Sequence, residues 1–162
     1  MTQACAISPT VSASRERKAI DMSQMTRRAV LAAAAAMIPT AALAQSTAPG
    51  DAYLYIIWPN DGQRIKGAFW CRFGLRNMGI ARAGDKTPNS GHHHLFVDVN
   101  EEIKAGDVIP SDKNHIHFGA GQSEARIELP PGRHTLQLVL GDAEHKIFSP
   151  PLVSRKIGVT VY

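Results

Sequence analysis

The chain has 162 residues, enough for one domain with a hydrophobic core, and it carries a formal net charge of +4. The positive excess belongs mostly to residues 1–44, because residues 45–162 contain thirteen basic and twelve acidic residues. A nearly neutral main part offers no strongly basic surface to a phosphate backbone. We therefore expect no nucleic-acid partner.

The first 44 residues have the pattern of an export address. Residues 1–24 are polar and lack periodicity, which indicates an unstructured leader or an over-extended start. Residues 25–44 combine Arg27 and Arg28 with a short alanine-rich apolar segment and small residues up to Ala44, the pattern of a cleavable signal peptide. The paired arginines resemble the twin-arginine export motif, with Sec export as the alternative. The apolar segment is too short to span a bilayer, which needs about 20 apolar residues. We therefore expect cleavage near Ala44 and a periplasmic or secreted product without a stable membrane anchor.

The remainder predicts one all-β domain at 53–162, preceded by a polar linker at 45–52. Short β-branched, aromatic or alternating segments are separated by glycine, proline, asparagine and aspartate, and no window keeps a helical period. The expected strands are 53–58, 65–75, 95–99, 116–118, 125–129, 134–140 and 153–161. About seven strands in a domain of this size are typical of an immunoglobulin-like antiparallel β-sandwich, with a small barrel as the alternative.

Cys71 is the single cysteine left once Cys5 departs with the leader, so no internal disulfide can form. It alternates with Phe69 and Phe73 in an apolar strand pattern. We expect its thiol to pack in the core.

All seven histidines lie between residues 92 and 145. Strand alternation places His92 and His94 on the face of their strand opposite the apolar residues, while His93 points toward the core. His115 and His117 have the same spacing on the next predicted strand. Antiparallel pairing of the two strands would gather up to four imidazoles, a donor set suited to copper or zinc. The predicted metal ligands are therefore His92, His94, His115 and His117, and a register slip of one residue would separate them.

Four other side chains are weaker candidates for the same site. His134 shares the apolar face of its strand, and His145 lies in a turn. Met78 would supply a soft thioether to Cu(I) from a glycine-rich loop. The weaker ligand candidates are His93, Met78, His134 and His145, and the expected outer carboxylates that orient imidazole N–H groups are Asp98 and Glu124. The alternative is that the histidines are ordinary side chains that hydrogen-bond loop backbones.

Four segments together resemble a family of small exported bacterial proteins, domain of unknown function 4399. These are Gly-His-His-His-Leu at 91–95, His-Ile-His-Phe-Gly at 115–119, Gly-Gln-Ser-Glu-Ala at 121–125 and the longer segment 131–142. The resemblance covers about residues 53–161. It implies an exported all-β domain and supplies no activity.

The leading hypothesis is an exported module that binds a copper or zinc ion and is not an enzyme. Metal affinity should then fall as the histidines protonate below about pH 6.5. One alternative is a non-catalytic adhesion or interaction domain whose partner is another envelope protein. A second is a metalloenzyme, because His115 and His117 resemble a copper–zinc superoxide dismutase strand and, with Glu124 and His134, the metal motifs of cupins, each at inexact spacing.

Overall fold

The computed structural model describes residues 46–162, so the leader expected at 1–24 and the export signal expected at 25–44 lie outside the described residues. The described part contains strands and no helix, and therefore no helix able to cross a membrane. The strands are β1 (Tyr53–Trp58), β2 (Gln63–Ile65), β3 (Phe69–Arg76), β4 (Gly79–Ile80), β5 (Ser90–Val97), β6 (His115–His117), β7 (Glu124–Ile127), β8 (Gly132–Gly141) and β9 (Ile157–Val161). The predicted all-β class is confirmed.

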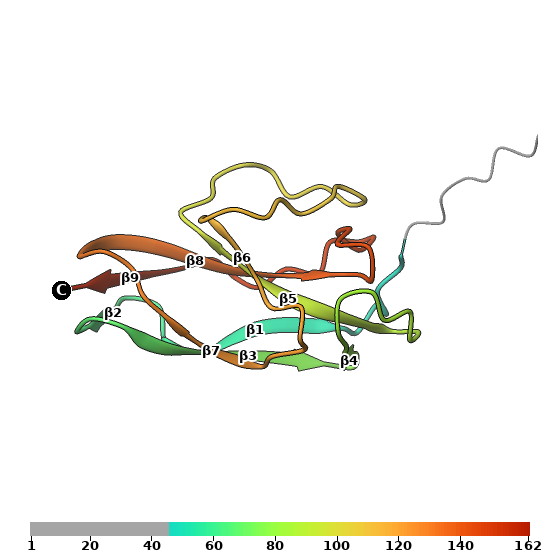
Figure 1. Ribbon diagram of the computed structural model, residues 1–162, viewed down its shortest axis with the longest axis horizontal. Helices are drawn as coiled ribbons and strands as arrows, with labels where there is room; N and C mark the ends of the chain where they lie inside the picture. Colours follow the sequence, from blue (N-terminus) through green and yellow to red (C-terminus); the bar gives the residue numbers. More distant parts are fainter. Residues whose placement is uncertain (1–45) are drawn as a thin grey trace, which may run out of the picture. The chain divides into compact units, whose positions relative to one another are not determined.

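Two sheets pack face to face as a sandwich (Figure 1). The smaller sheet has the order β1-β3-β7, and the larger has the order β2-β9-β8-β5-β4, with β6 also paired to β5. Most neighbours are antiparallel, as predicted, although β2 pairs with β9 and β4 pairs with β5 in parallel. The expected single strand at 65–75 is divided between β2 and β3, because the chain changes sheet around Gly67, whose φ is +63°.

The main core lies between the sheets and is built by alternation along the strands. The smaller sheet contributes Leu54, Phe69 and Phe73, and the larger contributes alternate leucines of β8. Cys71 is fully buried in this core, as predicted, and burial raises the pKa of its thiol to about 12. Cys71 therefore has a packing role.

Strand β5 is buried on both faces. Its outer face carries Phe96, which packs with Val139 and with Val99, Ile109 and Ile147 from the loops above the larger sheet. Figure 1 shows the loop after β5 arching over this sheet. His92 and His94 thus point away from the main core but are only 0% and 1% exposed. Strands covered on both faces normally consist of apolar residues. Burying a polar side chain there costs free energy unless the side chain has a hydrogen-bond or metal partner.

The start of the described chain is attached to the sandwich, whereas the sequence pattern suggested a linker at 45–52. Ser149 donates its backbone N–H to the carbonyl of Ser46, and Thr47 forms a bridge with Ser149. Ala48 is 5% exposed and belongs to the main core. The buried side chain of Ala48 therefore anchors this otherwise polar segment to the sandwich.

Candidate metal centre

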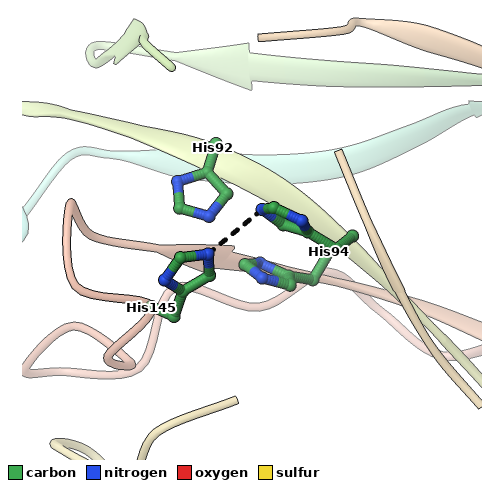
Figure 2. Close-up of side chains that lie close together, drawn as sticks. His92, His94 and His145 are labelled. Atoms are coloured by element: carbon green, nitrogen blue, oxygen red, sulfur yellow. Dashed lines mark hydrogen bonds between the residues drawn. The ribbon is translucent and has the colours of Figure 1, made fainter. Parts of the chain in front are cut away.

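Four histidines from three parts of the chain meet on the outer face of the larger sheet. His92 and His94 come from β5, His117 comes from β6, and His145 comes from the turn after β8. One ring nitrogen from each lies within 4.8 Å of the corresponding nitrogen of every other. Figure 2 shows the rings of His92, His94 and His145 directed toward one another. We call these four residues the histidine cluster.

The register between β5 and β6 decides which histidine of the second pair joins the cluster. His94 is opposite His117, whereas His115 is opposite Phe96. The His115 ring meets the Phe96 ring edge-on at a centroid distance of 4.5 Å, and its Nδ1 lies 2.9 Å from the carboxylate of Asp112. The structure therefore brings three of the four predicted ligands together and leaves His115 beside an aromatic ring.

His145 takes the fourth position in the cluster. It has a φ of +63°, a left-handed conformation that is uncommon for a residue with a side chain. Its N–H donates to the carbonyl of Asp142, and its own carbonyl accepts from the N–H of Ile109. The tight turn returns the His145 ring to β5 and β6. The local sequence shows only that His145 lies in a turn. The direction of its ring toward β5 and β6 depends on contacts with residues far away in the chain.

One pair of ring nitrogens in the cluster has the spacing found in a coordination sphere. The Nε2 atoms of His117 and His145 are 3.2 Å apart. A tetrahedral ion with metal–nitrogen bonds of about 2.0–2.1 Å holds its ligand nitrogens about 3.3 Å apart. The rings of His94 and His117 are stacked with centroids 5.1 Å apart, and the His92 and His145 centroids are 4.9 Å apart. The four donors lie within 4.8 Å of one another, so some of them would have to move closer to bind one tetrahedral ion.

Two glycines make room for the imidazoles. A Cβ on Gly141 would lie 2.7 Å from Cε1 of His94, and a Cβ on Gly119 would lie 2.5 Å from Nε2 of His117. Real side chains do not approach this closely, so an alanine at either position would have to displace the neighbouring histidine. The absence of side chains at 119 and 141 thus shapes the cluster.

Burial keeps the inner rings neutral. It lowers the pKa of His92 to about 4 and that of His94 to about 3, and the neighbouring histidines add to both effects. Burial also lowers the pKa of His117, with a further contribution from His145. Within residues 46–162, both ring nitrogens of His92 and Nδ1 of His94 are buried without a hydrogen-bond partner. His92 and His94 are therefore neutral imidazoles with buried ring nitrogens that have no partner, the form that binds metals.

The weaker ligand candidates other than His145 lie elsewhere. His93 points into the main core, where its Nδ1 donates to the carbonyl of Gln122 and its ring lies 5.1 Å from that of Phe73. Met78 packs against the main core. Both side chains therefore pack with the core, away from the outer face that carries the cluster.

His134 and the two expected outer carboxylates form separate contacts. Nδ1 of His134 lies 2.7 Å from Asp98, and its Nε2 donates to the carbonyl of Pro130. Burial alone would lower the pKa of His134, but these hydrogen bonds outweigh it and raise the pKa. Glu124 pairs with Arg72 at 3.2 Å. Neither carboxylate orients a ring of the histidine cluster.

The fold and site define an all-β sandwich that carries a four-histidine cluster, two of whose rings are buried, on its larger sheet. The chain belongs to the family described as Domain of unknown function (DUF4399), whose model matches residues 71–162 and so includes all four cluster histidines. No curated protein matches the chain. A solved structure that is similar is the endo-beta-1,4-mannanase from Thermotoga petrophila, at 19% identity and a TM-score of 0.38. The match covers 69% of this chain and 20% of the mannanase chain.

Proposed function

We propose that this protein is a transition-metal-binding module whose ligands are His92, His94, His117 and His145. The observation that carries the proposal is the convergence of four ring nitrogens within 4.8 Å, two of the rings being almost completely buried. A buried polar group without a partner costs about 1–3 kcal/mol. An ion would give such nitrogens a partner, which offsets this cost.

The donor set supports Cu(II) or Zn(II) as the ion. All four donors are imidazoles, which suit copper and zinc, while Mg²⁺ and Ca²⁺ prefer oxygen ligands. Within residues 46–162 the two sulfur-containing side chains, Cys71 and Met78, pack in or against the main core and not at the cluster. Soft sulfur ligands are those that select Cu(I). Divalent copper or zinc is therefore expected to bind more tightly than Cu(I).

The number of protein ligands favours binding over catalysis. Catalytic zinc sites have three protein ligands and keep a position for water or substrate, whereas structural sites have four. Four histidines fill a tetrahedral ion. Together with the export pattern at 25–44, this supports a role in metal handling in the periplasm or outside the cell.

The proposal is tested by adding Cu(II), Zn(II) and Cu(I) separately to metal-stripped protein and measuring affinity by calorimetry and chelator competition. We expect one equivalent of Cu(II) or Zn(II) to bind with a dissociation constant well below about 10 μM, in the range where a single site is readily saturated. The control variant replaces all four cluster histidines with alanine. Failure of all three ions to bind more tightly than about 10 μM would overturn the proposal.

A metal-binding role also differs from an adhesion role in a second measurement. A ligand that binds the native state raises its stability, so the thermal midpoint should rise with Cu(II) or Zn(II) and fall back with a chelator. An adhesion domain without a metal would show the same thermal midpoint without additions, with Cu(II) or Zn(II), and with a chelator.

A further inference from the structure

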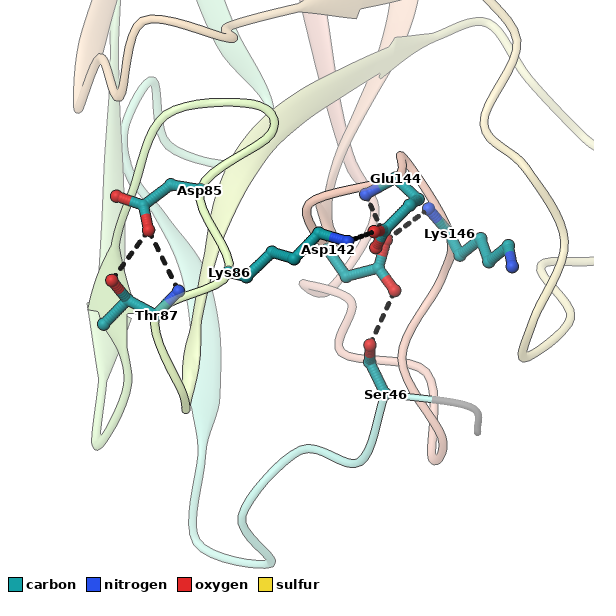
Figure 3. Close-up of polar contacts among 7 residues, drawn as sticks. All are labelled: Ser46, Asp85, Lys86, Thr87, Asp142, Glu144 and Lys146. Carbon is teal, nitrogen blue, oxygen red and sulfur yellow. Dashed lines mark hydrogen bonds and ion pairs between the residues drawn. The ribbon is translucent and has the colours of Figure 1, made fainter. Parts of the chain in front are cut away.

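The position of His145 depends on a neighbouring carboxylate, Asp142. Asp142 is 5% exposed, and its Oδ1 accepts the backbone N–H groups of Glu144 at 2.9 Å and Lys146 at 2.8 Å. These two N–H groups flank His145 in the chain. Figure 3 shows the Asp142 carboxylate bonded to Glu144 and Lys146. Asp142 therefore holds both sides of His145, whose left-handed conformation directs its ring to the cluster.

The second oxygen of Asp142 binds a distant part of the chain. Its Oδ2 accepts a hydrogen bond from the hydroxyl of Ser46 at 2.6 Å, across 96 positions of sequence. Ser46 is itself held by the N–H of Ser149 at 2.8 Å, and the segment is fixed by Ala48 in the main core. Residues 46–48 thus contact the turn that carries His145 through a partly buried, charge-assisted hydrogen bond, a strong type.

A second contact to the turn is more exposed. Lys86 and Glu144 form an ion pair of 2.9 Å, but their side chains are 79% and 50% exposed. Exposed ion pairs contribute little to stability. The buried carboxylate of Asp142 is therefore the principal side-chain support of the turn.

Asp142 supports the cluster without joining it as a ligand. Its two oxygens accept three hydrogen bonds, two from backbone N–H groups and one from a hydroxyl. Neither oxygen is among the converging donor atoms, which all belong to the four histidines. Its effect on an ion would thus pass through the position of His145.

We propose that docking of residues 46–48 onto Asp142 sets the metal affinity of the histidine cluster by holding His145 in place. The inference rests on the proposed function and adds a means of regulating it. When the segment is docked, the fourth ligand is positioned. When Ser46 and Asp142 separate, Asp142 keeps its two backbone hydrogen bonds but loses the one to residues 46–48, and the turn holds His145 less firmly.

The test compares Asp142→Ala, Asp142→Asn and Ser46→Ala in the full chain, with Cu(II) affinity measured by chelator competition. Loss of a group that orients a ligand typically weakens metal binding about 10- to 100-fold, and we expect this for Asp142→Ala. Ser46→Ala removes one of the three hydrogen bonds and should weaken binding about 3-fold, a smaller share of the same effect. Asp142→Asn keeps an oxygen for the two N–H groups and should fall between these variants.

Asp85→Ala is a matched control. Asp85 accepts the N–H of Thr87 at 2.9 Å in a neighbouring turn that contains no histidine (Figure 3). Its removal should leave Cu(II) affinity unchanged. Far-ultraviolet circular dichroism of the metal-free variants checks folding, and Asp142→Asn and Ser46→Ala carry the test if Asp142→Ala does not fold.

A double-mutant cycle with His145→Ala separates positioning from a general loss of stability. If Asp142 acts through His145, then Asp142→Ala or Asp142→Asn should cause no further loss of affinity in the His145→Ala background. The paramagnetic resonance spectrum of the Cu(II) form should show four coordinated nitrogens in the unaltered chain and three in Asp142→Ala.

Three results would overturn the inference. Equal affinity of the unaltered chain and all Asp142 and Ser46 variants would overturn it while the proposed function stands. The same loss in both His145 backgrounds would show that Asp142 acts on the fold as a whole. Absence of metal binding by the unaltered chain would overturn both proposals.

Discussion

His94 on β5 and His117 on β6 are direct cross-strand partners whose rings stack with centroids 5.1 Å apart. Their pairing places the neighbouring histidine of β6, His115, opposite Phe96. Two histidines separated by one residue on a short strand therefore have different surroundings. One faces other imidazoles, and the other faces an aromatic ring and the carboxylate of Asp112.

This difference predicts opposite results for two matched substitutions. His117→Ala should weaken Cu(II) or Zn(II) binding by about 100-fold or more, since loss of a ligand should cost at least as much as loss of an outer group that orients one. His115→Ala should leave the affinity within about 3-fold, because its ring lies outside the cluster. Calorimetric titration of both variants measures the contrast. Equal losses would contradict the ligand assignment.

Gly119→Ala should weaken metal binding without unfolding the protein. The new Cβ would lie 2.5 Å from Nε2 of His117, which must swing aside. Because the His117 ring is exposed, it can move into solvent, so the thermal midpoint of the metal-free protein should change by only a few degrees. Gly50→Ala is the control, since nothing lies within 4 Å of its added Cβ. Unchanged affinity in Gly119→Ala would show that His117 is not a ligand.

The metal-free protein should lose stability as the pH falls from about 6.5 toward 4. In the unfolded chain His92 and His94 take up protons near their ordinary pKa of 6.5, whereas in the folded chain burial lowers these pKa values to about 4 and about 3. The unfolded state thus binds more protons in this range, and the free energy of unfolding decreases. His134 has a raised pKa and acts in the opposite direction.

Urea unfolding at pH 7.5, 6.0 and 4.5 measures this dependence. Each unit of pKa difference corresponds to about 1.4 kcal/mol, so the two buried histidines should lower the free energy of unfolding by a few kcal/mol. A His94→Asn variant should show a shallower decrease. A stability that stays constant down to pH 4.5 would contradict the burial of these rings.

The lowered pKa values also revise the expectation from sequence that metal affinity falls below about pH 6.5. The inner histidines stay neutral in the folded protein well below that pH, so protons compete with the ion only at lower pH. Cu(II) affinity measured between pH 7 and 5 should therefore decrease less than that of a solvent-exposed histidine site.

Cys71 should be unreactive in the folded protein. Its thiol is fully buried, and burial raises its pKa to about 12, so the reactive thiolate is scarce at pH 8. In a chain with Cys5→Ser, iodoacetamide should label Cys71 in urea but not in buffer. Rapid labelling without denaturant would mean that the core around Phe69 and Phe73 opens readily.

Sequence alone determined the all-β class and the face of each strand, because side chains alternate at every second residue whatever the strand pairs with. It thereby placed Cys71 and His93 toward the core and His92 with His94 on the opposite face. It also identified the histidines as the chemically distinctive residues.

Only the tertiary structure decided which histidines meet. The register between β5 and β6 selected His117 over His115, and the hydrogen bonds of Asp142 directed the turn that brings His145 to the cluster. The rings of His117 and His145 lie against those of His92 and His94, whose burial lowers their pKa values. Alternation is a local property of the backbone, whereas register, turn direction and burial depend on contacts between residues far apart in the chain. For that reason the pattern could indicate the site but not its fourth member.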